Sequence, residues 1–560
     1  MPITITDISQ LTRLSNPRGS TDEILPDPWD DREKRLRAFH ATQNIYKKNI
    51  ANLSKILNKH HNVNFSVKYW SIVCGPWFRV FTNRLYHFWE YFESIEIRST
   101  VSIELPNFNL EDFVAKDQSN FYEISRLESW NQLVIGQLAK RRGVKIHLVN
   151  LESPRRDHSR LERDMGKPSK MLRTINVFLD LFSRKTVLVT ASNLTNWQKF
   201  KLMIPLRERL YFLEHEFSLP VFDYDLNQRH SLVEAAGELE NIECEFENTL
   251  IELALLHMPR PFIEGFVECN SLSIQSRLPK KPSVILTGTA IYTNELFKIY
   301  SAAKIEKGCK LCIICHGGGA HLYTDFLEHE LDICDRYFTW GWQHKSPKCV
   351  KGFNIELPKR DKITGKERSL LMIMTASQDN TEFLESMPSK RQFRIDYVDD
   401  QIKFVNQLRN NIVPKTKIRL SEHRDSFVKK GMYSLYPNLH YIYRGEELST
   451  YKNNAKILVL TYNETAIVQA LASYKPTVVF FRPQHFEMNS DGVNVYEELR
   501  QVGVFHDTPE SAAQHVNNIW ENVSDWWNSQ AVQAAVERHN SEFSRTSEQP
   551  TKELLSLVTF

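Results

Sequence analysis

The 560-residue sequence has no cysteine framework, no long apolar run and almost no net charge. Its eight cysteines are scattered, unlike the closely spaced pairs of a disulfide-rich secreted protein. No charged-then-apolar leader opens the chain, and no apolar run approaches the ~20 residues of a membrane span. The formal net charge is +3 with both signs interleaved, which argues against a stripe that binds a polyanion. We therefore expect a cytoplasmic protein with reduced thiols and no nucleic-acid partner.

Aromatic residues are plentiful, with 32 phenylalanines and 11 tryptophans, and they gather with basic residues between positions 68 and 92. Packing of Trp70, Trp77, Phe78 and Trp89 into a core is the favoured explanation. The alternative is a peripheral contact with the inner face of a membrane, because aromatic and basic side chains also suit a lipid surface.

The length predicts two or three domains. Residues 1–30 are polar and interrupted by proline, which indicates a loosely held arm. Apolar residues recur at helical spacing over residues 32–59, so we expect a long amphipathic helix there. The pair Gly75-Pro76 is expected to break the aromatic-rich helix that follows.

Three apolar runs predict buried parallel strands, at residues 185–190, 283–287 and 311–315. Residues 294–307 fit a helix between the last two strands, with Asn294 as its N-cap and Gly308 as its terminator. Connections of this kind are almost always right-handed. We therefore expect Thr287 and His316 at the same edge of one sheet.

His316 is followed by three glycines directly after a predicted strand. Gly317 and Gly318 lack the Cβ atoms that would keep a ligand away from the backbone. In open α/β sheets ligands bind outside the carboxyl ends of the strands. A tight turn with a hydrogen-bonded histidine explains the motif equally well. We take His316 as a candidate catalytic residue and the two glycines as candidate ligand-binding positions.

Cys312 and Cys315 precede His316 at a spacing that formally matches a haem-attachment or metal-ligand pattern. Side chains alternate faces along a strand, so the two thiols point in opposite directions and cannot share a metal. Their apolar neighbours suit small buried hydrophobes. We predict no metal at this motif.

The aperiodic segment 336–354 is expected to be a linker between domains. Five further apolar runs predict a second sheet, at residues 369–376, 416–420, 440–443, 456–461 and 477–481. The fold class is therefore α/β, with an N-terminal helical portion and two doubly wound Rossmann-like domains that face each other across a cleft. The predicted divisions are an arm at 1–30, α/β domains at 31–355 and 356–530, and a helical tail at 531–560.

A polar turn follows the predicted strand 456–461 and consists of Tyr462, Asn463, Glu464 and Thr465. Asn463 and Thr465 offer oxygens that would cap the helix 466–473, and the free N–H groups at its start would favour a phosphate. Glu464 competes for that positive end, and would instead accept a hydrogen bond from a ribose hydroxyl. An ordinary N-cap is the alternative explanation.

Arg419 ends its own predicted strand and would place a permanent cation at the same edge. A plain surface arginine is the alternative. Polar and glycine-rich loops on one domain, with a helix N-terminus and an arginine on the other, imply a cleft for a phosphorylated ligand, as in GT-B glycosyltransferases. We expect His316 and the Asn463 turn to face each other across that crevice.

Several segments, in order along the chain, resemble the bacterial family of transferases of surface carbohydrate biosynthesis. They are YWSIVCGPWF at 69–78, TGTAIYTNELFK at 287–298, CHGGGAH at 315–321, EHELDICDRYFTWGW at 328–342, TYNETAIVQALASYKPTVVFF at 461–481 and GVFHDTPESAAQHVNNIWENVSDWW at 503–527. The spacing of His316 and Arg336 also resembles, more weakly, that of the retaining Kdo transferases.

This resemblance implies a cytoplasmic GT-B glycosyltransferase with no cofactor beyond its donor. Its second domain would bind a nucleotide sugar, CMP-linked as in Kdo transfer, and its first domain would hold a glycan or glycolipid acceptor of the bacterial surface. Three features depart from the family pattern: Cys315 where glutamine is common, Ala320-His321 in place of Tyr-Gly, and Gln469 in place of a glutamate that could hold the ribose. They leave the identity of the donor open.

Glycosyl transfer requires that the leaving phosphate be neutralised. No DxD motif stands in a suitable loop, so we expect helix N–H groups with Arg336 and Arg419 to stabilise the departing charge without a metal. His316 would position a donor carboxylate or phosphate, or act as a base. Glu295 is a candidate nucleophile for a retaining reaction, although a first-turn glutamate also suits a helix N-terminus.

Two other functions fit the same sequence. One is a non-catalytic carbohydrate-binding module on a degenerate GT-B fold. The other is a phosphotransferase that uses a CDP-polyol donor. Turnover separates the first from an enzyme, and the released nucleotide and the transferred group separate the second from sugar transfer.

Overall fold

The computed structural model describes residues 3–5, 13–14, 23–24, 31–94, 101–143, 145–149, 186–190, 209–213, 219–238, 244–275, 278–318, 325–354, 368–375, 391–420, 427–443, 446–486 and 488–558. The chain divides into two compact units. The first comprises Met1–Ile313, Glu328–Asp335 and Phe383–Glu385, and the second comprises Ile314–Leu327, Arg336–Glu382 and Ser386–Phe560. The domain boundary predicted near residue 355 falls within the second unit, which also contains the predicted tail.

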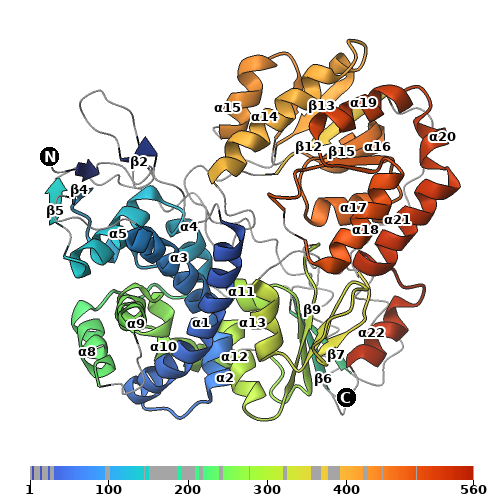
Figure 1. The fold of residues 1–560 in the computed structure, drawn as a ribbon. Coiled ribbons are helices and arrows are strands. Elements are labelled where there is room, and N and C mark those ends of the chain that lie inside the picture. Colours follow the sequence, from blue (N-terminus) through green and yellow to red (C-terminus); the bar gives the residue numbers. More distant parts are fainter. Residues whose placement is uncertain are drawn as a thin grey trace. The chain divides into compact units, whose positions relative to one another are not determined.

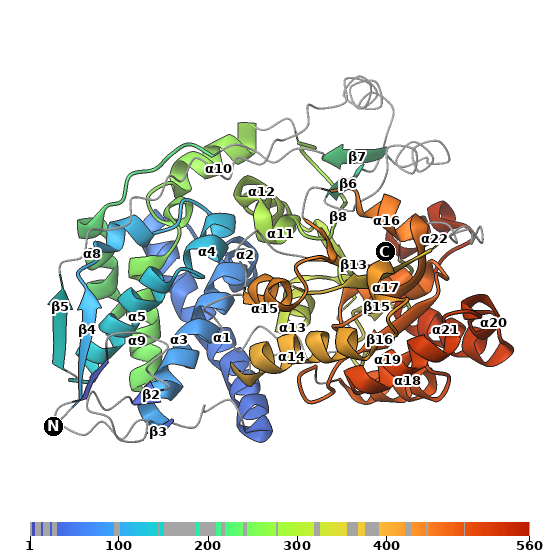
Figure 2. The same cartoon turned by 90° about the horizontal axis from the view of Figure 1, so that it is seen from above.

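Helices dominate the N-terminal part of the first unit. They are α1 (Arg32–His61), α2 (Val67–Val73), α3 (Gly75–Ser94), α4 (Gln118–Ile124), α5 (Glu128–Arg141), α8 (Leu226–Ala236), α9 (Glu245–His257) and α10 (Phe266–Gln275). α1 is the long amphipathic helix expected from the sequence, and the Asp31 carboxylate caps it by accepting the N–H groups of Glu33 and Lys34. α1, α3 and α9 pack side by side, as Figure 2 shows.

The aromatic segment forms part of this helical core. The helix breaks between α2 and α3, where Gly75 follows Cys74, as predicted. Trp70, Trp77 and Phe78 are fully buried, and Trp89 is 7% exposed. Core packing therefore accounts for these side chains. No helix in the described part of the chain is long and apolar enough to cross a membrane.

The first unit also holds strands. β1 (Ile3–Ile5), β4 (Val101–Pro106) and β5 (Lys145–Val149) form one parallel sheet, and β2 (Arg13–Leu14) pairs antiparallel with β3 (Glu23–Ile24). The predicted arm thus contributes a strand to a sheet. A second parallel sheet runs in the order β7-β6-β8-β9, with β6 (Thr186–Thr190), β7 (Arg209–Leu213), β8 (Val284–Thr287) and β9 (Lys310–Ile314).

The predicted strand-helix-strand unit is present between β8 and β9. It contains α11 (Ala290–Thr293) and α12 (Glu295–Ile305). The Asn294 Oδ1 atom accepts the N–H of Phe297 at 2.9 Å, which makes Asn294 the expected N-cap. Gly308 has a φ of +91°, a conformation that few side chains tolerate, and it ends the connection. Thr287 pairs with Ile313, so the two strands end together.

The second unit is built on a six-stranded, fully parallel sheet. Its strands are β12 (Ser369–Ile373), β13 (Thr416–Arg419), β14 (His440–Ile442), β15 (Ala455–Leu460), β16 (Thr477–Phe480) and β17 (Phe505–His506). The order is β14-β13-β12-β15-β16-β17. Counted from β12, this is the Rossmann order 3-2-1-4-5-6, which reverses direction between β12 and β15.

Helices cover both faces of this sheet. The helices that follow its first strand in the chain are α14 (Arg391–Gln407), α15 (Phe427–Leu435), α16 (Leu448–Asn454), α17 (Thr465–Ala472), α18 (Ser490–Gln501), α19 (Pro509–Ile519), α20 (Val523–Trp527), α21 (Gln530–Phe543) and α22 (Pro550–Val558), while α13 (Asp325–Ile333) precedes that strand. Figure 1 shows α14 and α19 on one side and α17, α18 and α21 on the other. Strands buried on both faces explain the unbroken apolar runs in the sequence.

The predicted linker at 336–354 is wrong. This segment contains β10 (Arg336–Phe338) and β11 (Cys349–Val350), which pair in parallel, and its aromatic residues Trp340 and Trp342 are buried. The backbone N–H of Arg545 donates to the carbonyl of Trp340 at 2.7 Å. Most of the segment has irregular backbone, so its apolar residues show neither helical nor strand spacing. Its aromatic side chains nevertheless pack into the second unit.

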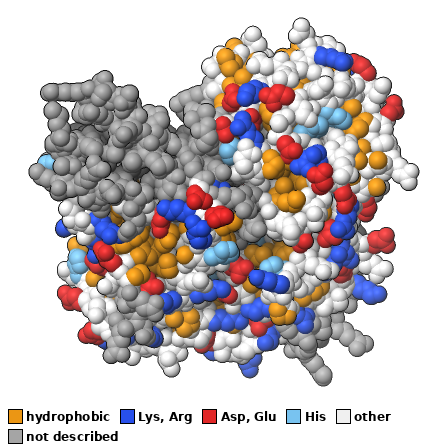
Figure 3. All heavy atoms as spheres, viewed as in Figure 1, with side chains coloured by type: hydrophobic (Ala, Val, Ile, Leu, Met, Phe, Trp, Pro, Cys, Tyr) orange, Lys and Arg blue, Asp and Glu red, His pale blue; other side chains and the backbone are white. Residues whose placement is uncertain are grey.

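The fold class is confirmed: the chain is α/β, with a helical N-terminal part and parallel, Rossmann-like sheets in both units. All the predicted strands are present, with ends that differ by a few residues. On the described part of the face shown in Figure 3, Lys and Arg side chains are intermixed with Asp and Glu.

The N-cap of α12 yields a first prediction. Asn294→Ala removes the acceptor of the Phe297 N–H, and we expect a loss of about 1 kcal/mol in the free energy of unfolding of the first unit. Asn294→Ser keeps a capping oxygen and should lose less than half of that. Urea denaturation followed by tryptophan fluorescence measures both. Equal losses in the two variants would contradict the capping role.

Candidate functional site

The reversal of strand order in the second unit marks the place where sheets of this kind bind ligands. Tyr397 of α14 lies at this point. Its hydroxyl accepts the N–H of Thr375, beyond β12, at 2.8 Å and lies 2.6 Å from Oγ1 of Thr461, beyond β15. The Thr461 hydroxyl lies 3.3 Å from the carbonyl of Ile373. These bonds hold the carboxyl ends of the two central strands at a fixed spacing.

The glycine loop reaches the start of α17 in the same unit. The N–H of Cys315 donates to the carbonyl of Phe338 at 2.8 Å, and the N–H of Gly318 donates to Oγ1 of Thr465 at 2.9 Å. A Cβ atom on Gly318 would lie 2.8 Å from Cα of Thr465 and 2.7 Å from Cγ2 of Val468. Only glycine permits this approach. His316 is half-buried in the loop.

The loop and the 462–465 turn are therefore in contact within the second unit. Asn463 is fully buried, and its Oδ1 accepts the Tyr496 hydroxyl at 2.5 Å. The N-cap of α17 is Glu464, whose side chain makes no capping bond. The predicted capping by Asn463 and Thr465 is wrong, because one oxygen serves Tyr496 and the other serves Gly318.

Electrostatics single out Glu464. Its side chain is exposed, yet the surrounding protein removes enough water to raise the pKa of the carboxyl. Burial and the nearby Glu464 raise the pKa of the half-buried Tyr462, while Arg419 opposes that shift. Arg419 donates from Nη1 to the carbonyl of Tyr443. An accessible carboxyl with a perturbed pKa at a helix start is typical of a binding site.

A second polar cluster follows the end of β16. The Arg482 guanidinium makes two bonds to Asp400, at 2.7 and 2.8 Å, and lies 3.1 Å from Oδ2 of Asp396. Nε2 of His485 lies 2.8 Å from the same Asp396 oxygen. Burial raises the pKa of Asp400, and its bonds to Arg482 oppose that shift. A cavity of about 10 Å³ lies beside Asp400 and Tyr397, roughly the space of one water molecule.

Glu295 occupies a different environment, in the first unit. It is 3% exposed, accepts the N–H of Gln118 at 2.6 Å and lies 2.7 Å from Nζ of the fully buried Lys298. Burial raises the pKa of its carboxyl, and Lys298 opposes that shift. The Lys298 ammonium also donates to Oε1 of Gln118. These contacts give Glu295 a structural ion pair inside the unit.

Arg336 also makes a structural contact, because its Nη1 donates to the carbonyl of Leu557 in α22 at 2.8 Å. All eight cysteines are free thiols, and Cys312 and Cys315 are buried among apolar neighbours. Among the described residues, no group of three or more His, Cys, Asp or Glu side chains could hold a metal ion. Gly319, Ala320 and His321 lie outside the described residues.

Sequence reasoning missed Tyr397, Asp396, Asp400 and the residues after β16. The position of Arg482 and His485 directly after a buried strand was an available signal, since strand ends meet at one edge of the sheet. The role of Tyr397 carried no signal, because helical periodicity gives the buried face of α14 but not the neighbour of a hydroxyl.

The sequence matches the family described as LIC12162 family transferase over residues 10–558. The chain belongs to this transferase family. No curated protein matches the chain.

Several solved structures resemble the fold loosely. A UDP-N-acetylglucosamine 2-epimerase of Listeria monocytogenes is 10% identical, with a TM-score of 0.36 over 67% of this chain and 96% of that chain. The UDP-GlcNAc 2-epimerase of Neisseria meningitidis is 13% identical, with a TM-score of 0.36 over 67% and 99%. A variant O-GlcNAc transferase of Thermobaculum terrenum is 10% identical, with a TM-score of 0.33 over 88% and 82%. At such low TM-scores, the strand order carries the fold assignment.

The two glycines offer a matched pair of variants. Gly318→Ala forces a methyl group against the backbone of Thr465, so we expect a loss of about 1–3 kcal/mol in the stability of the second unit. In Gly317→Ala the nearest atom is Oγ1 of Thr465 at 3.7 Å, an ordinary contact, and the change should stay within about 0.5 kcal/mol. Thermal unfolding of both variants is the measurement, and equal losses would contradict the close approach.

The Glu295 ion pair gives a third prediction. Glu295→Ala leaves Lys298 buried without its carboxylate, so we expect a loss of about 3–5 kcal/mol. The double variant Glu295→Leu, Lys298→Met replaces both charges with apolar groups and should recover at least half of that loss. Urea midpoints decide between the outcomes. Unchanged stability of Glu295→Ala would show that the ion pair does not contribute to the free energy of unfolding.

Proposed function

We propose that this chain is a GT-B glycosyltransferase that binds a nucleotide-activated sugar at the carboxyl edge of the second unit's sheet. The contact between Gly318 and Thr465 carries the proposal, because it sets a histidine-bearing loop against the start of a helix beside the exposed Glu464. Membership of a transferase family supports group transfer. The reversal of strand order between β12 and β15 supports a ligand at this edge.

In this proposal the donor's phosphate lies near the first turn of α17, where backbone N–H groups point outward. Glu464 accepts hydrogen bonds from the ribose hydroxyls, beside Tyr462, and Arg419 adds a positive charge from β13. Gly317 and Gly318 let the loop backbone come close to the ligand. Asn463 supports the turn through Tyr496 instead of touching the ligand.

The chemistry follows from these positions. An acceptor oxygen forms a bond to the anomeric carbon while the bond from that carbon to the phosphate oxygen breaks. The leaving phosphate gains negative charge, which the α17 N–H groups and Arg419 stabilise. The acceptor's proton passes to His316, because an imidazole is a common general base. By the resemblance of the sequence motifs, the donor is CMP-linked, as with Kdo, and the acceptor is a bacterial surface glycan or glycolipid.

A second candidate function is binding of carbohydrate without turnover. The burial of Glu295 against Lys298 favours it, because this pairing removes the carboxylate that a retaining double displacement would use. A transfer reaction that does not use Glu295 is not affected by this burial. Turnover of any nucleotide sugar separates the two functions.

Nucleotide binding tests the proposal directly. A thermal-shift screen with CMP, CDP, UDP, GDP and TDP should give one clear responder, since a ligand at 100 times its Kd stabilises the native state by roughly 2.7 kcal/mol. His316→Ala should abolish transfer from the matching sugar, while His440→Ala, an exposed histidine at the start of β14, should retain it. If none of the nucleotides raises the unfolding temperature, the proposed donor site is wrong.

The raised pKa of Glu464 adds a prediction with a defined sign. A carboxyl whose pKa is raised in the folded state destabilises that state once pH exceeds its unfolded value, so Glu464→Gln should increase stability at neutral pH. The same variant should weaken nucleotide binding by about tenfold, because it loses an ionised acceptor. Wild-type affinity should fall as pH drops through the raised pKa, and the variant's affinity should not.

Glu498→Gln on α18 is the matched control, because Glu498 is an exposed carboxylate that lies outside the 462–465 turn. It should change neither stability nor affinity. Loss of nucleotide binding in both variants would point to a general charge effect instead of a contact with the ribose.

A further inference from the structure

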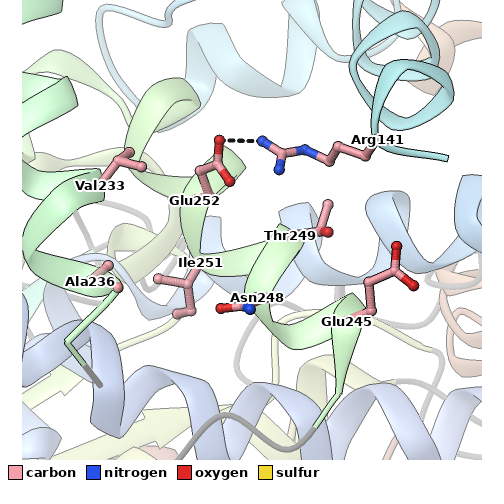
Figure 4. Close-up of a pocket in the computed structure, with 9 residues that line it drawn as sticks. Arg141, Val233, Ala236, Glu245, Asn248, Thr249, Ile251 and Glu252 are labelled. Carbon is pink, nitrogen blue, oxygen red and sulfur yellow. Dashed lines mark ion pairs between the residues drawn. The ribbon is translucent and has the colours of Figure 1, made fainter. Parts of the chain in front are cut away.

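A cavity of about 330 Å³ opens in the first unit, where the last turns of α5 and α8 meet the first half of α9. Figure 4 shows the side chains that line it. Ligand pockets typically span about 300–1,000 Å³, so this volume suits a small ligand. None of these helices contributes to the site proposed above.

The charges around the cavity are already paired. Arg141 at the end of α5 forms an ion pair with Glu252 of α9, drawn as a dashed line in Figure 4. Glu245 lies 3.5 Å from Arg142, whose guanidinium stacks over the Trp89 ring at 3.9 Å from its centroid. A strongly charged ligand would have to break one of these pairs. The cavity therefore favours a neutral ligand.

The paired charges still offer hydrogen bonds to hydroxyl groups. Glu252 and Arg141 keep about a third of their side-chain surface exposed, and Asn248 is exposed between them and Glu245. A hydroxyl donates to a carboxylate and accepts from a guanidinium or an amide, so it fits a wall of alternating acceptors and donors. Thr249, which is largely buried, also lines the cavity.

Apolar side chains also line the cavity. They are Val233 and Ala236 of α8 and Ile251 of α9, toward the left in Figure 4. A ligand that fills the site must present a C–H surface to these residues and polar groups to the wall. A pyranose ring does both, since its ring face is apolar and its rim carries hydroxyls.

We propose that this cavity is a binding site for a neutral saccharide of about one ring. The inference goes beyond the proposed donor site, because it concerns other residues, a ligand without phosphate and binding without transfer. It places a carbohydrate-recognising surface on the helical part of the first unit.

Saturation-transfer NMR on the full chain tests the proposal, with glucose, galactose, mannose and N-acetylglucosamine as probes and with inorganic phosphate and spermidine as charged comparisons. Asn248→Trp places a large side chain in the cavity from an exposed helical position. Glu252→Gln removes a charged acceptor. Glu234→Gln is the control, because Glu234 is an exposed carboxylate of α8 that does not line the cavity.

We expect at least one sugar to bind, with affinity reduced more than about tenfold by Asn248→Trp, about threefold to tenfold by Glu252→Gln, and less than twofold by the control. Each variant's unfolding temperature and nucleotide shift are recorded in the same samples. Sugar binding that survives Asn248→Trp, no sugar binding at all, or binding of the charged probes alone would overturn the proposal. A lost nucleotide response with intact sugar binding would count against the donor site only.

Discussion

The close contact between the backbone of Gly318 and Thr465 is the constraint on which the candidate site depends. Because residue 318 has no Cβ atom, the backbone of the histidine loop can contact the first residue of α17 and donate to its hydroxyl. That contact fixes the position of the loop relative to the sheet edge where Tyr397 joins β12 to β15. The loop contact and the spacing of β12 and β15 therefore both depend on hydrogen bonds to hydroxyls, which are short-ranged and directional.

Buried charge plays opposite roles in the two units. In the first unit Glu295 and Lys298 are almost completely removed from water and form a buried ion pair. In the second unit the carboxyl of Glu464 has a raised pKa because nearby protein excludes water, but its side chain is still exposed. A ligand that donates hydrogen bonds could therefore reach this carboxyl. Accessibility, more than the direction of the pKa shift, distinguishes a candidate site from a structural pair.

The sequence predicted the elements well and their contacts poorly. Unbroken apolar runs identified β6, β8 and β9 of the first unit and β12 to β16 of the second, but not the edge strands β7 and β17. The cap at Asn294 was visible in the residue types, and Gly75 marked a helix break. The direction in which Asn463 points could not be predicted, because its partner Tyr496 is 33 positions away and no local pattern connects them. The segment 336–354 misled for a related reason: its buried tryptophans are held by irregular backbone, which has no period to detect.

Hydrogen bonds join residues 336–354 of the second unit to residues 545–557, near its other end. Arg336 donates to the carbonyl of Leu557, Arg545 bonds to the carbonyls of Trp340 and Gly352, and Asn354 donates to the carbonyl of Arg545. β10 and β11 can therefore pair with each other early in synthesis, but their bonds to Arg545 and Leu557 form only after about two hundred further residues have been made, at rates of roughly 5–20 residues per second.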